Sequence, residues 1–248
     1  MIPKVIHYCW FGRNPLPESA QKCIASWKKF LPEYEIKEWN EDNFDVNIIP
    51  YTKEAYEAKK YAFVSDYARF WILYLYGGLY FDTDVEVVKP LDDIIEQGAF
   101  MGIETPAIDG MKAPRVAPGL GIATEAGTDF YKELLAYYDE LHFLDDNGKP
   151  NEITIVEHTT KVLVSHGMFP HNAIQQVAGI WIYPVDYFNP LDDNTGRLRM
   201  TSNTRSIHWY SKTWMSKSQI SRNKMTRILH RWFGVNSLKW LKRIISWG

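Results

Sequence analysis

The segment from residue 61 to residue 84 constrains the fold more than any other part of the sequence. It begins with a helical stretch that Gly77-Gly78 would end. After position 69 this stretch is apolar on every side, so we expect the helix to be buried in the core. A short apolar strand at residues 79–81 then runs directly into Asp82-Thr83-Asp84. This order predicts a packed domain that contains both helices and a buried sheet.

The rest of the chain alternates strand-like and helix-like segments up to about residue 210. Strands are predicted where β-branched and aromatic residues lie between turn residues, and helices where apolar residues recur every three or four positions. The chain begins β-α-β, which favours an α/β fold with helices on the faces of a sheet. The other predicted strands are residues 4–10, 35–39, 85–88, 101–104, 120–123, 180–183 and 205–209, and the other predicted helices are residues 18–30, 128–142 and 154–166.

Charge is distributed unevenly along the chain. The 248 residues include 28 Lys and Arg and 30 Asp and Glu, but residues 197–248 hold 12 of the basic residues and no acidic one. Residues 1–196 therefore carry 16 basic and 30 acidic groups, a net charge of −14. Such a body repels a nucleic-acid backbone, so no nucleic-acid partner is expected. The basic segment also holds five of the ten tryptophans, which points to an anionic partner.

Residues 216–248 are predicted to form basic amphipathic helices C-terminal to a domain of residues 1–215. Apolar residues recur at helical spacing over residues 225–233 and again over 238–245, with Arg and Lys on the opposite faces. Helices of this kind lie in the interface of a membrane, so an anionic membrane surface is an expected partner. The alternative for residues 225–233 is that their apolar stripe packs on the protein's own core.

Nothing in the sequence predicts secretion or a membrane-spanning helix. The longest nearly apolar run, residues 70–81, has 12 residues, whereas a spanning helix needs about 20. The N-terminus lacks the basic and then apolar pattern of a signal peptide. Cys9 and Cys23 alone make neither a disulfide framework nor a zinc cluster. We expect a cytoplasmic protein, peripheral to the cytoplasmic face of the membrane.

Asp82 and Asp84, at the end of an apolar strand, are candidate metal ligands. Mn²⁺ and Mg²⁺ take oxygen ligands, often one or two carboxylates completed by phosphate oxygens. A bare D-x-D pattern is more often a polar turn, but its context here is unusual. Asp66 and Arg69 lie three residues apart on the preceding helix and face the same way. Two buried charges either pair structurally or line a polar cavity, and the sequence leaves both open.

These residues resemble the signature of glycosyltransferase family 32, the DXD sugar transferases. The family includes bacterial capsular polysaccharide and lipopolysaccharide enzymes, and the clostridial glucosylating toxins have a similar core. The resemblance covers about residues 2–214. It rests on Ser65-Asp66-Tyr-Ala-Arg69 with Tyr76-Gly-Gly-Leu-Tyr-Phe-Asp82-Thr-Asp84, on the start Ile2–Gly12, on Trp39–Asn43, and on residues 207–214, where Trp209 replaces the family's second His and Lys212-Thr213 replace its Gly-Ser.

The resemblance implies a GT-A-type fold, a Rossmann-like nucleotide-sugar-binding mixed sheet flanked by helices. It also implies a metal-dependent, retaining enzyme that needs Mn²⁺ or Mg²⁺. Such an enzyme would move a hexose or an N-acetylhexosamine from a nucleotide sugar, with a UDP-sugar favoured. The acceptor would be a saccharide, expected to be lipid-linked, in bacterial surface polysaccharide synthesis.

The same resemblance assigns roles to eight residues. Three of them, Asp82, Asp84 and Trp214, would belong to the catalytic machinery. The metal would be held by Asp84, with Asp82 and His208 as further ligands. The substrate-binding residues would be Trp10 against the nucleotide base, Asp66 and Arg69 at the donor-sugar hydroxyls, and Thr213 beside Trp214 at the leaving diphosphate. No spacing selects a nucleophile among Glu104, Asp109, Glu125 and Glu157.

Two other functions fit parts of the sequence. A haloacid-dehalogenase-type phosphotransferase would use Asp82 and Asp84 as nucleophile and acid/base, but its motif normally ends the first strand of the domain. A non-catalytic, membrane-bound carbohydrate-binding module would explain the basic tail and the aromatic residues. It gives no reason for a D-x-D pattern beside Asp66 and Arg69.

Overall fold

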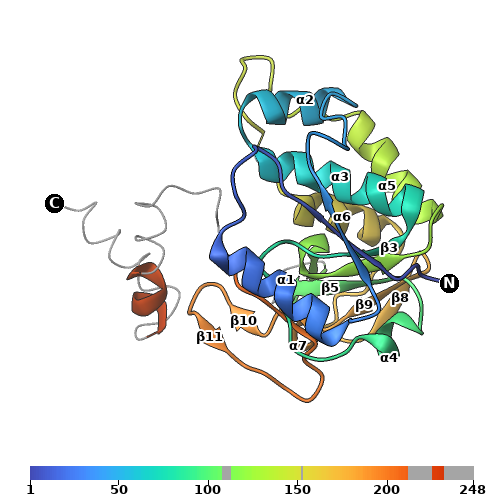
Figure 1. The fold of residues 1–248 in the computed structure, drawn as a ribbon, viewed down its shortest axis with the longest axis vertical. Helices are drawn as coiled ribbons and strands as arrows, with labels where there is room; N and C mark the ends of the chain where they lie inside the picture. Colours follow the sequence, from blue (N-terminus) through green and yellow to red (C-terminus); the bar gives the residue numbers. More distant parts are fainter. Residues whose placement is uncertain (108–112, 152, 212–224, 232–248) are drawn as a thin grey trace.

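The computed structural model describes residues 1–107, 113–151, 153–211 and 225–231. Its centre is an eight-stranded mixed sheet in the order β2-β1-β3-β7-β5-β9-β8, with β6 paired to β5 (Figure 1). This architecture confirms the predicted α/β fold with a mixed sheet flanked by helices. The strands are β1 (Val5–Cys9), β2 (Glu35–Trp39), β3 (Gly78–Tyr80), β5 (Phe100–Thr105), β6 (Arg115–Val116), β7 (Ile122–Thr124), β8 (Gln175–Val177) and β9 (Ile180–Tyr183).

Helices cover both faces of the sheet, because its strands are apolar on both sides. Successive residues of β3 show this alternation, since Leu79 packs on one face and Tyr80 on the other. Figure 1 shows one group of helices above the sheet and the other below it. One face is covered by α1 (Glu18–Phe30), α4 (Asp92–Ile95) and α7 (Val185–Phe188), and the other by α2 (Pro50–Glu57), α3 (Tyr61–Tyr76), α5 (Asp129–Asp139) and α6 (Ile155–Ser165).

Four predicted elements have the bounds that the structure shows: α1, α3, β2 and β9. The prediction that α3 is buried on every side after position 69 is wrong for its last turn. Leu75 is 46% exposed and Tyr76 is 47% exposed. The apolar composition of this turn hid the fact that the helix end reaches the surface. The sequence analysis also missed α2 and a small hairpin formed by β10 (Leu191–Asp192) and β11 (Arg197–Leu198).

A separate two-stranded sheet joins distant parts of the chain beside the D-x-D segment. Its strands are β4 (Val85–Val87) and β12 (Ser206–His208), which run antiparallel with His208 opposite Val85. Trp209 continues the pairing, because its backbone N–H donates to the carbonyl of Asp84 at 2.9 Å. Residues 206–211 are thereby fixed next to Asp84, although more than a hundred positions separate them in the sequence.

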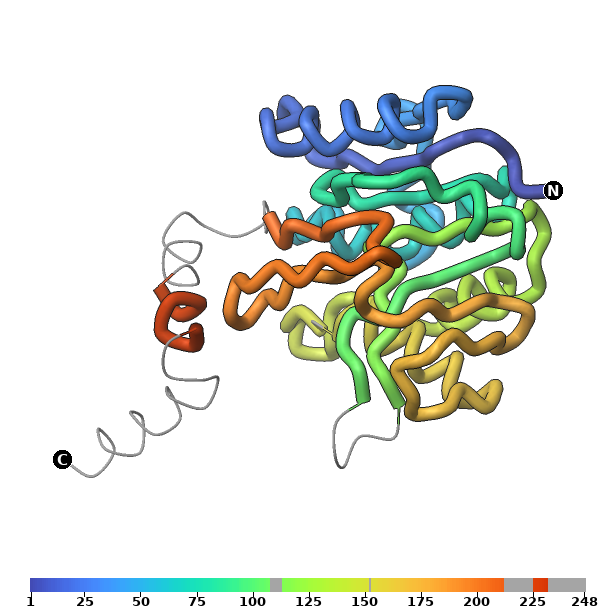
Figure 2. The backbone as a smooth tube through the Cα atoms, turned by 90° about the horizontal axis from the view of Figure 1, so that it is seen from below, coloured from blue at the N-terminus to red at the C-terminus, as the bar shows by residue number. Residues whose placement is uncertain are grey.

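The described part of the tail, helix 225–231, contacts the β10–β11 hairpin through its basic face (Figures 1 and 2). Arg227 forms an ion pair with Asp193, and Arg231 donates to the carbonyls of Thr195 and Gly196 at 3.1 and 2.7 Å. Two apolar residues of this helix face away from the hairpin, since Met225 is 63% exposed and Ile228 is 58% exposed. Met225 and Ile228 therefore do not pack on the core, whereas the alternative is not tested for the rest of the stripe. Residues 232–248 lie outside the described residues.

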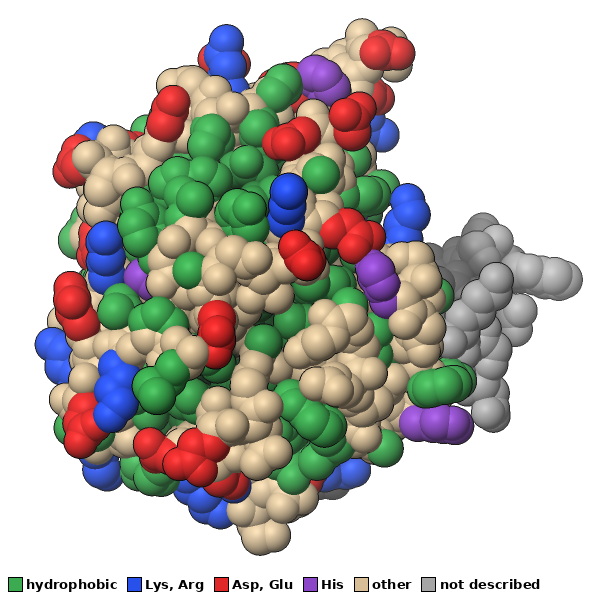
Figure 3. Space-filling model, turned by 90° about the vertical axis from the view of Figure 1, so that its right-hand side faces the viewer, with side chains coloured by type: hydrophobic (Ala, Val, Ile, Leu, Met, Phe, Trp, Pro, Cys, Tyr) green, Lys and Arg blue, Asp and Glu red, His purple; other side chains and the backbone are tan. Residues whose placement is uncertain are grey.

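Elsewhere the surface has a mixed character. The face in Figure 3 carries interspersed apolar, acidic and basic side chains, without a continuous basic area. Among the described residues, no helix is both long enough and apolar enough to cross a membrane.

Candidate active site

The carboxyl ends of β1, β3 and β5 meet at one edge of the sheet. β1 is parallel to β3, and β5 has the same direction because β7 runs antiparallel to both β3 and β5. Trp10 follows β1, Asp82 follows β3, and Glu104 lies at the end of β5. In open α/β sheets, ligands bind outside the carboxyl ends of the strands. The predicted site residues therefore emerge where such a sheet binds its ligand.

A buried guanidinium brings three predicted site residues together. Arg69, which is 3% exposed, donates from Nη2 to Asp66 Oδ1 at 3.0 Å and reaches Asp82 Oδ1 at 3.2 Å. Its Nε donates to the carbonyl of Ser65 at 3.1 Å. The Tyr80 hydroxyl also donates to Asp82 Oδ1, at 3.2 Å. We call Asp66, Arg69 and Asp82 the Arg69 group.

The two carboxylates of the Arg69 group share one positive charge. Burial raises the pKa of Asp66 to about 7, against the opposing effect of Arg69 and with a further increase from the charge of Asp82. Asp66 is the more deeply enclosed of the two acids, since Asp82 keeps 30% of its side chain exposed. A ligand that donates hydrogen bonds to Asp66 would therefore favour its ionised form.

This arrangement predicts the pH dependence of stability. Between about pH 4 and pH 7 the folded chain keeps a proton on Asp66 that the unfolded chain has released. The free energy of unfolding should therefore fall as pH rises, by up to about 1.4 kcal/mol per pH unit for this group. Asp66→Asn cannot ionise, so its unfolding free energy should fall less steeply. Urea unfolding at several pH values checks this, and equal slopes for the two proteins would contradict it.

Gly119 allows the backbone to approach Asp82 closely. It lies in the short 3-10 helix Pro118–Leu120, and its carbonyl accepts a hydrogen bond from the backbone N–H of Asp82 at 3.2 Å. A Cβ atom on Gly119 would lie 2.0 Å from Asp82 Oδ2 and 3.2 Å from Arg69 Nη1. The Arg69 group can therefore have this geometry only with glycine at position 119.

Gly119→Ala is expected to displace the Asp82 carboxylate and to lower activity by at least about tenfold, because a misplaced site group loses its alignment with the substrate. Gly148→Ala is the control for a strained glycine substitution away from the site, since its φ is +72° but a Cβ atom there meets nothing within 4 Å. Activity and melting temperature should be measured for both variants. The prediction is wrong if Gly119→Ala retains the activity of the control.

Asp84 and His208 form a second pair at the site. Asp84 Oδ1 lies 3.1 Å from His208 Nε2, and Asp84 Oδ2 accepts hydrogen bonds from the N–H and the hydroxyl of Ser211 at 2.8 and 3.0 Å. Burial alone would raise the pKa of Asp84, but the charge of His208 and the hydrogen bonds from His208 and Ser211 hold it well below its ordinary value. Asp84 is therefore a fixed anion.

The Asp84–His208 pair suits a divalent cation. Asp84 Oδ1 and His208 Nε2 lie 3.1 Å apart, so a cation bound by both would replace the proton that they share, and Mg²⁺ or Mn²⁺ commonly uses a few protein ligands completed by phosphate oxygens. The carboxylate of Asp82 contacts Arg69 and Tyr80 instead of the Asp84–His208 pair, and its role as a further metal ligand stays a prediction. Within the described ranges, no group of three His, Cys, Asp or Glu is placed to hold a metal.

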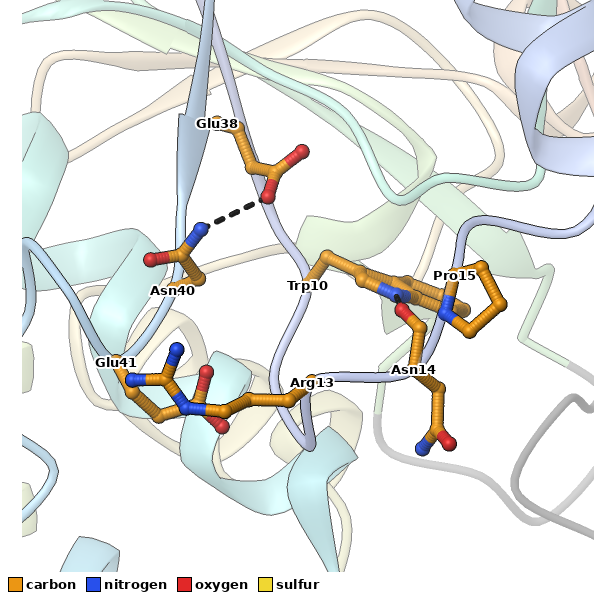
Figure 4. Close-up of a pocket in the computed structure, with 7 residues that line it drawn as sticks. All are labelled: Trp10, Arg13, Asn14, Pro15, Glu38, Asn40 and Glu41. Carbon is orange, nitrogen blue, oxygen red and sulfur yellow. Dashed lines mark hydrogen bonds between the residues drawn. The ribbon is translucent and has the colours of Figure 1, made fainter.

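Trp10 lines an open cavity of about 400 Å³ (Figure 4). Its indole N–H donates to the carbonyl of Asn14 at 2.6 Å, which fixes the ring at the cavity wall. Glu38 and Asn40 line the cavity too and are joined by a hydrogen bond of 2.9 Å. A flat aromatic wall with polar groups beside it can bind a planar base.

Two predicted residues, Thr213 and Trp214, lie outside the described residues. The structure adds Ser211 and Gly119, which the sequence analysis missed. Ser211 lies within the His208–Trp214 motif, so that motif was a signal for it. Gly119 had no local signal, because its role depends on a contact with residue 82 across the sheet.

Residues 17–101 match the family described as "Glycosyltransferase sugar-binding region containing DXD motif". This range includes the Arg69 group and Asp84. Over this range the chain is similar to the DXD-type glycosyltransferase sugar-binding region.

Curated relatives of this sugar-binding region include two glycosyltransferases. The chain is 31% identical over 110 residues to inositol phosphoceramide mannosyltransferase 3 of Schizosaccharomyces pombe, which covers 43% of this chain and 31% of the relative. It is 34% identical over 106 residues to the uncharacterized glycosyltransferase L373 of Acanthamoeba polyphaga mimivirus, which covers 40% of this chain and 42% of the relative. The matches thus span less than half of each relative.

A solved structure of the galactosyltransferase LgtC, in complex with donor and acceptor sugar analogues, is also similar. The TM-score is 0.48 and the sequence identity 12%, and the alignment covers 90% of this chain and 95% of that one.

Proposed function

We propose that the protein is a metal-dependent, retaining glycosyltransferase that moves a hexose or an N-acetylhexosamine from a nucleotide sugar to a saccharide acceptor. The observation that carries this proposal is the placement of the Asp84–His208 pair beside the Arg69 group at one sheet edge. The match to a DXD sugar-binding region supports it.

Each residue has a task that its surroundings support. Asp84 and His208 would hold Mn²⁺ or Mg²⁺, which offsets the negative charge that develops on the leaving diphosphate. Asp66 and Arg69 would bind hydroxyl groups of the donor sugar, since a carboxylate beside a guanidinium offers both acceptors and donors. Asp82 would contact the ribose and the sugar, and Trp10 would carry the base.

The donor is a nucleoside-diphosphate sugar, with a UDP-sugar as our first choice. The test is a panel of UDP- and GDP-sugars, read by product mass with Mn²⁺, with Mg²⁺ and in EDTA. Turnover of at least one donor only in the presence of a divalent ion is expected. Full activity in EDTA, or no turnover of any donor, would refute the proposal.

The same assay separates the two other functions. A phosphotransferase of the haloacid-dehalogenase type would release phosphate from simple phosphomonoesters. Its aspartate ends the first strand of its domain, whereas here β1, β2 and α3 precede the strand that leads to Asp82. A carbohydrate-binding module would bind sugars without turnover.

The acceptor in this proposal is lipid-linked, as in bacterial surface polysaccharide synthesis. The name of the Schizosaccharomyces pombe relative specifies a lipid acceptor, an inositol phosphoceramide, which supports this choice. The protein would then work at the cytoplasmic face of the membrane. Helix 225–231 supports membrane contact, because its basic face is occupied by the hairpin and its apolar residues Met225 and Ile228 are exposed.

Membrane contact through this helix predicts an effect of two substitutions. Met225→Glu combined with Ile228→Glu should weaken sedimentation with anionic vesicles at least about tenfold, because each buried apolar side chain contributes roughly 1.5–3 kcal/mol. Leu198→Glu, also at an exposed apolar residue, is the control. Full-length protein and a chain ending at Val235 should be compared in the same assay. Equal binding by all of these proteins would contradict a membrane role for the tail.

A further inference from the structure

A second polar cluster lies near His208, away from the Arg69 group. Glu104 accepts a hydrogen bond from the Tyr210 hydroxyl, and its carboxylate interacts with the charges of His208 and Arg115. In the sheet, β7 lies between β3 and β5. The ends that carry Asp82 and Glu104 are therefore two strand spacings apart, about 10 Å.

The Glu104 cluster contains buried polar atoms that the described residues do not satisfy. Asn189 is 5% exposed, and its Nδ2 donates to the carbonyl of Glu104 at 2.9 Å and to the Tyr210 hydroxyl at 2.7 Å. Its Oδ1 has no partner among the described residues, and neither has Nδ1 of His208. A buried polar atom without a partner costs about 1–3 kcal/mol. Both atoms are therefore open to hydrogen-bonding partners beyond the described residues, such as a bound ligand.

Glu104 is also distinguished from the other carboxylates that the sequence left open. Glu125 follows β7 at the opposite edge of the sheet and pairs with the amino group of Met1. Glu157 lies on the first turn of α6, where its side chain caps the helix with Thr154. Asp109 lies outside the described residues. Of these three described carboxylates, Glu104 alone lies on a strand whose carboxyl end is at the edge of Asp82, whereas Glu157 reaches the same region only through its pair with Arg115 at 3.7 Å.

We propose that Glu104 belongs to the acceptor-binding site, where its carboxylate accepts hydrogen bonds from hydroxyl groups of a neutral saccharide. This inference rests on the proposed function, since the donor sugar is assigned to the Arg69 group on the other side of His208. Tyr210 orients the carboxylate of Glu104. The centroid of the Tyr210 ring lies 4.2 Å from that of the His208 ring, and the Tyr210 hydroxyl donates to Glu104. A negative charge at this place excludes acidic sugars, because like charges repel.

The test measures binding of simple sugars with the diphosphate site filled. Methyl α-mannoside, methyl α-glucoside, methyl β-galactoside and methyl α-glucuronide are titrated by saturation-transfer NMR with Mg²⁺ and whichever of UDP and GDP the protein binds. At least one neutral glycoside should bind wild-type protein better than the glucuronide. Glu104→Gln should weaken that glycoside at least about tenfold, or 1.4 kcal/mol, with unchanged nucleotide affinity. Glu125→Gln should bind the glycoside and the nucleotide with wild-type affinity.

Three results would overturn the inference: no glycoside binding by wild-type protein, an equal loss in Glu125→Gln, or a loss of nucleotide affinity instead of glycoside affinity in Glu104→Gln. If Glu104→Gln does not fold, Glu104→Asp keeps the charge one methylene further back, and it should still weaken the glycoside and not the nucleotide. Failure of the proposed function is seen separately, as absence of nucleotide-sugar turnover by the wild-type protein.

Discussion

Replacing Asp84 with alanine is expected to lower turnover of the nucleotide sugar about 10³-fold, because the developing charge of the diphosphate loses its metal-binding anion. The carboxylate is held by His208 and Ser211, so no other described side chain takes its place. Asp84→Asn should lose activity to a similar degree, since the amide has no charge. Steady-state assays with Mn²⁺, together with Mn²⁺ binding by electron paramagnetic resonance, measure both effects.

The control for Asp84 is Glu86→Gln, a second acid two residues further on. Its carboxylate accepts a hydrogen bond from the Trp209 indole at 2.9 Å, so it has a comparable place beside β12. This control should keep wild-type turnover and metal binding. Melting temperatures must accompany both variants, because Asp84→Ala leaves His208 without its partner at a cost of about 1–3 kcal/mol. Unimpaired turnover in a folded Asp84→Ala protein would remove Asp84 from the mechanism.

The fold was largely predictable because its signals are local. The helices α1 and α3 follow from apolar periodicity and from Pro32 and Gly77-Gly78 at their ends. The hairpin β10–β11 was missed because its strands have only two residues each and no alternating pattern. Local patterns also suggested that the whole of α3 is buried, and only the tertiary contacts of its last turn decide otherwise.

The site was predictable only where its residues share an element. Asp66 and Arg69 lie on one helix, so their spacing already placed them together. The positions of His208 and Ser211 depend on the pairing of β4 with β12, which no local pattern specifies. The separation of Asp82 from the Asp84–His208 pair depends on Arg69 and Tyr80 holding its carboxylate. Which polar side chains pair with one another is therefore decided by tertiary contacts and not by sequence spacing.

Arg69→Ala is expected to give the largest loss of stability, about 3–5 kcal/mol, because it leaves two carboxylates in or near the core without their cation. Arg69 also donates to the Ser65 carbonyl and stacks over the Tyr80 ring, 4.8 Å from its centroid. Urea unfolding measures the loss. The matched control is Arg205→Ala, because Arg205 pairs with a largely exposed acid, Asp93. An equal cost for both variants would contradict a burial effect.

A double variant separates the structural role of Arg69 from its role in binding. Arg69→Met with Asp66→Leu replaces the buried pair by apolar side chains and should recover most of the lost stability. The folded double variant should still bind free UDP but should lose the additional affinity for the UDP-sugar, because both hydroxyl-binding groups are gone. Trp10→Ala, by comparison, should weaken both ligands equally through the loss of base stacking. If the double variant turned over the nucleotide sugar at the wild-type rate, Asp66 and Arg69 would be purely structural.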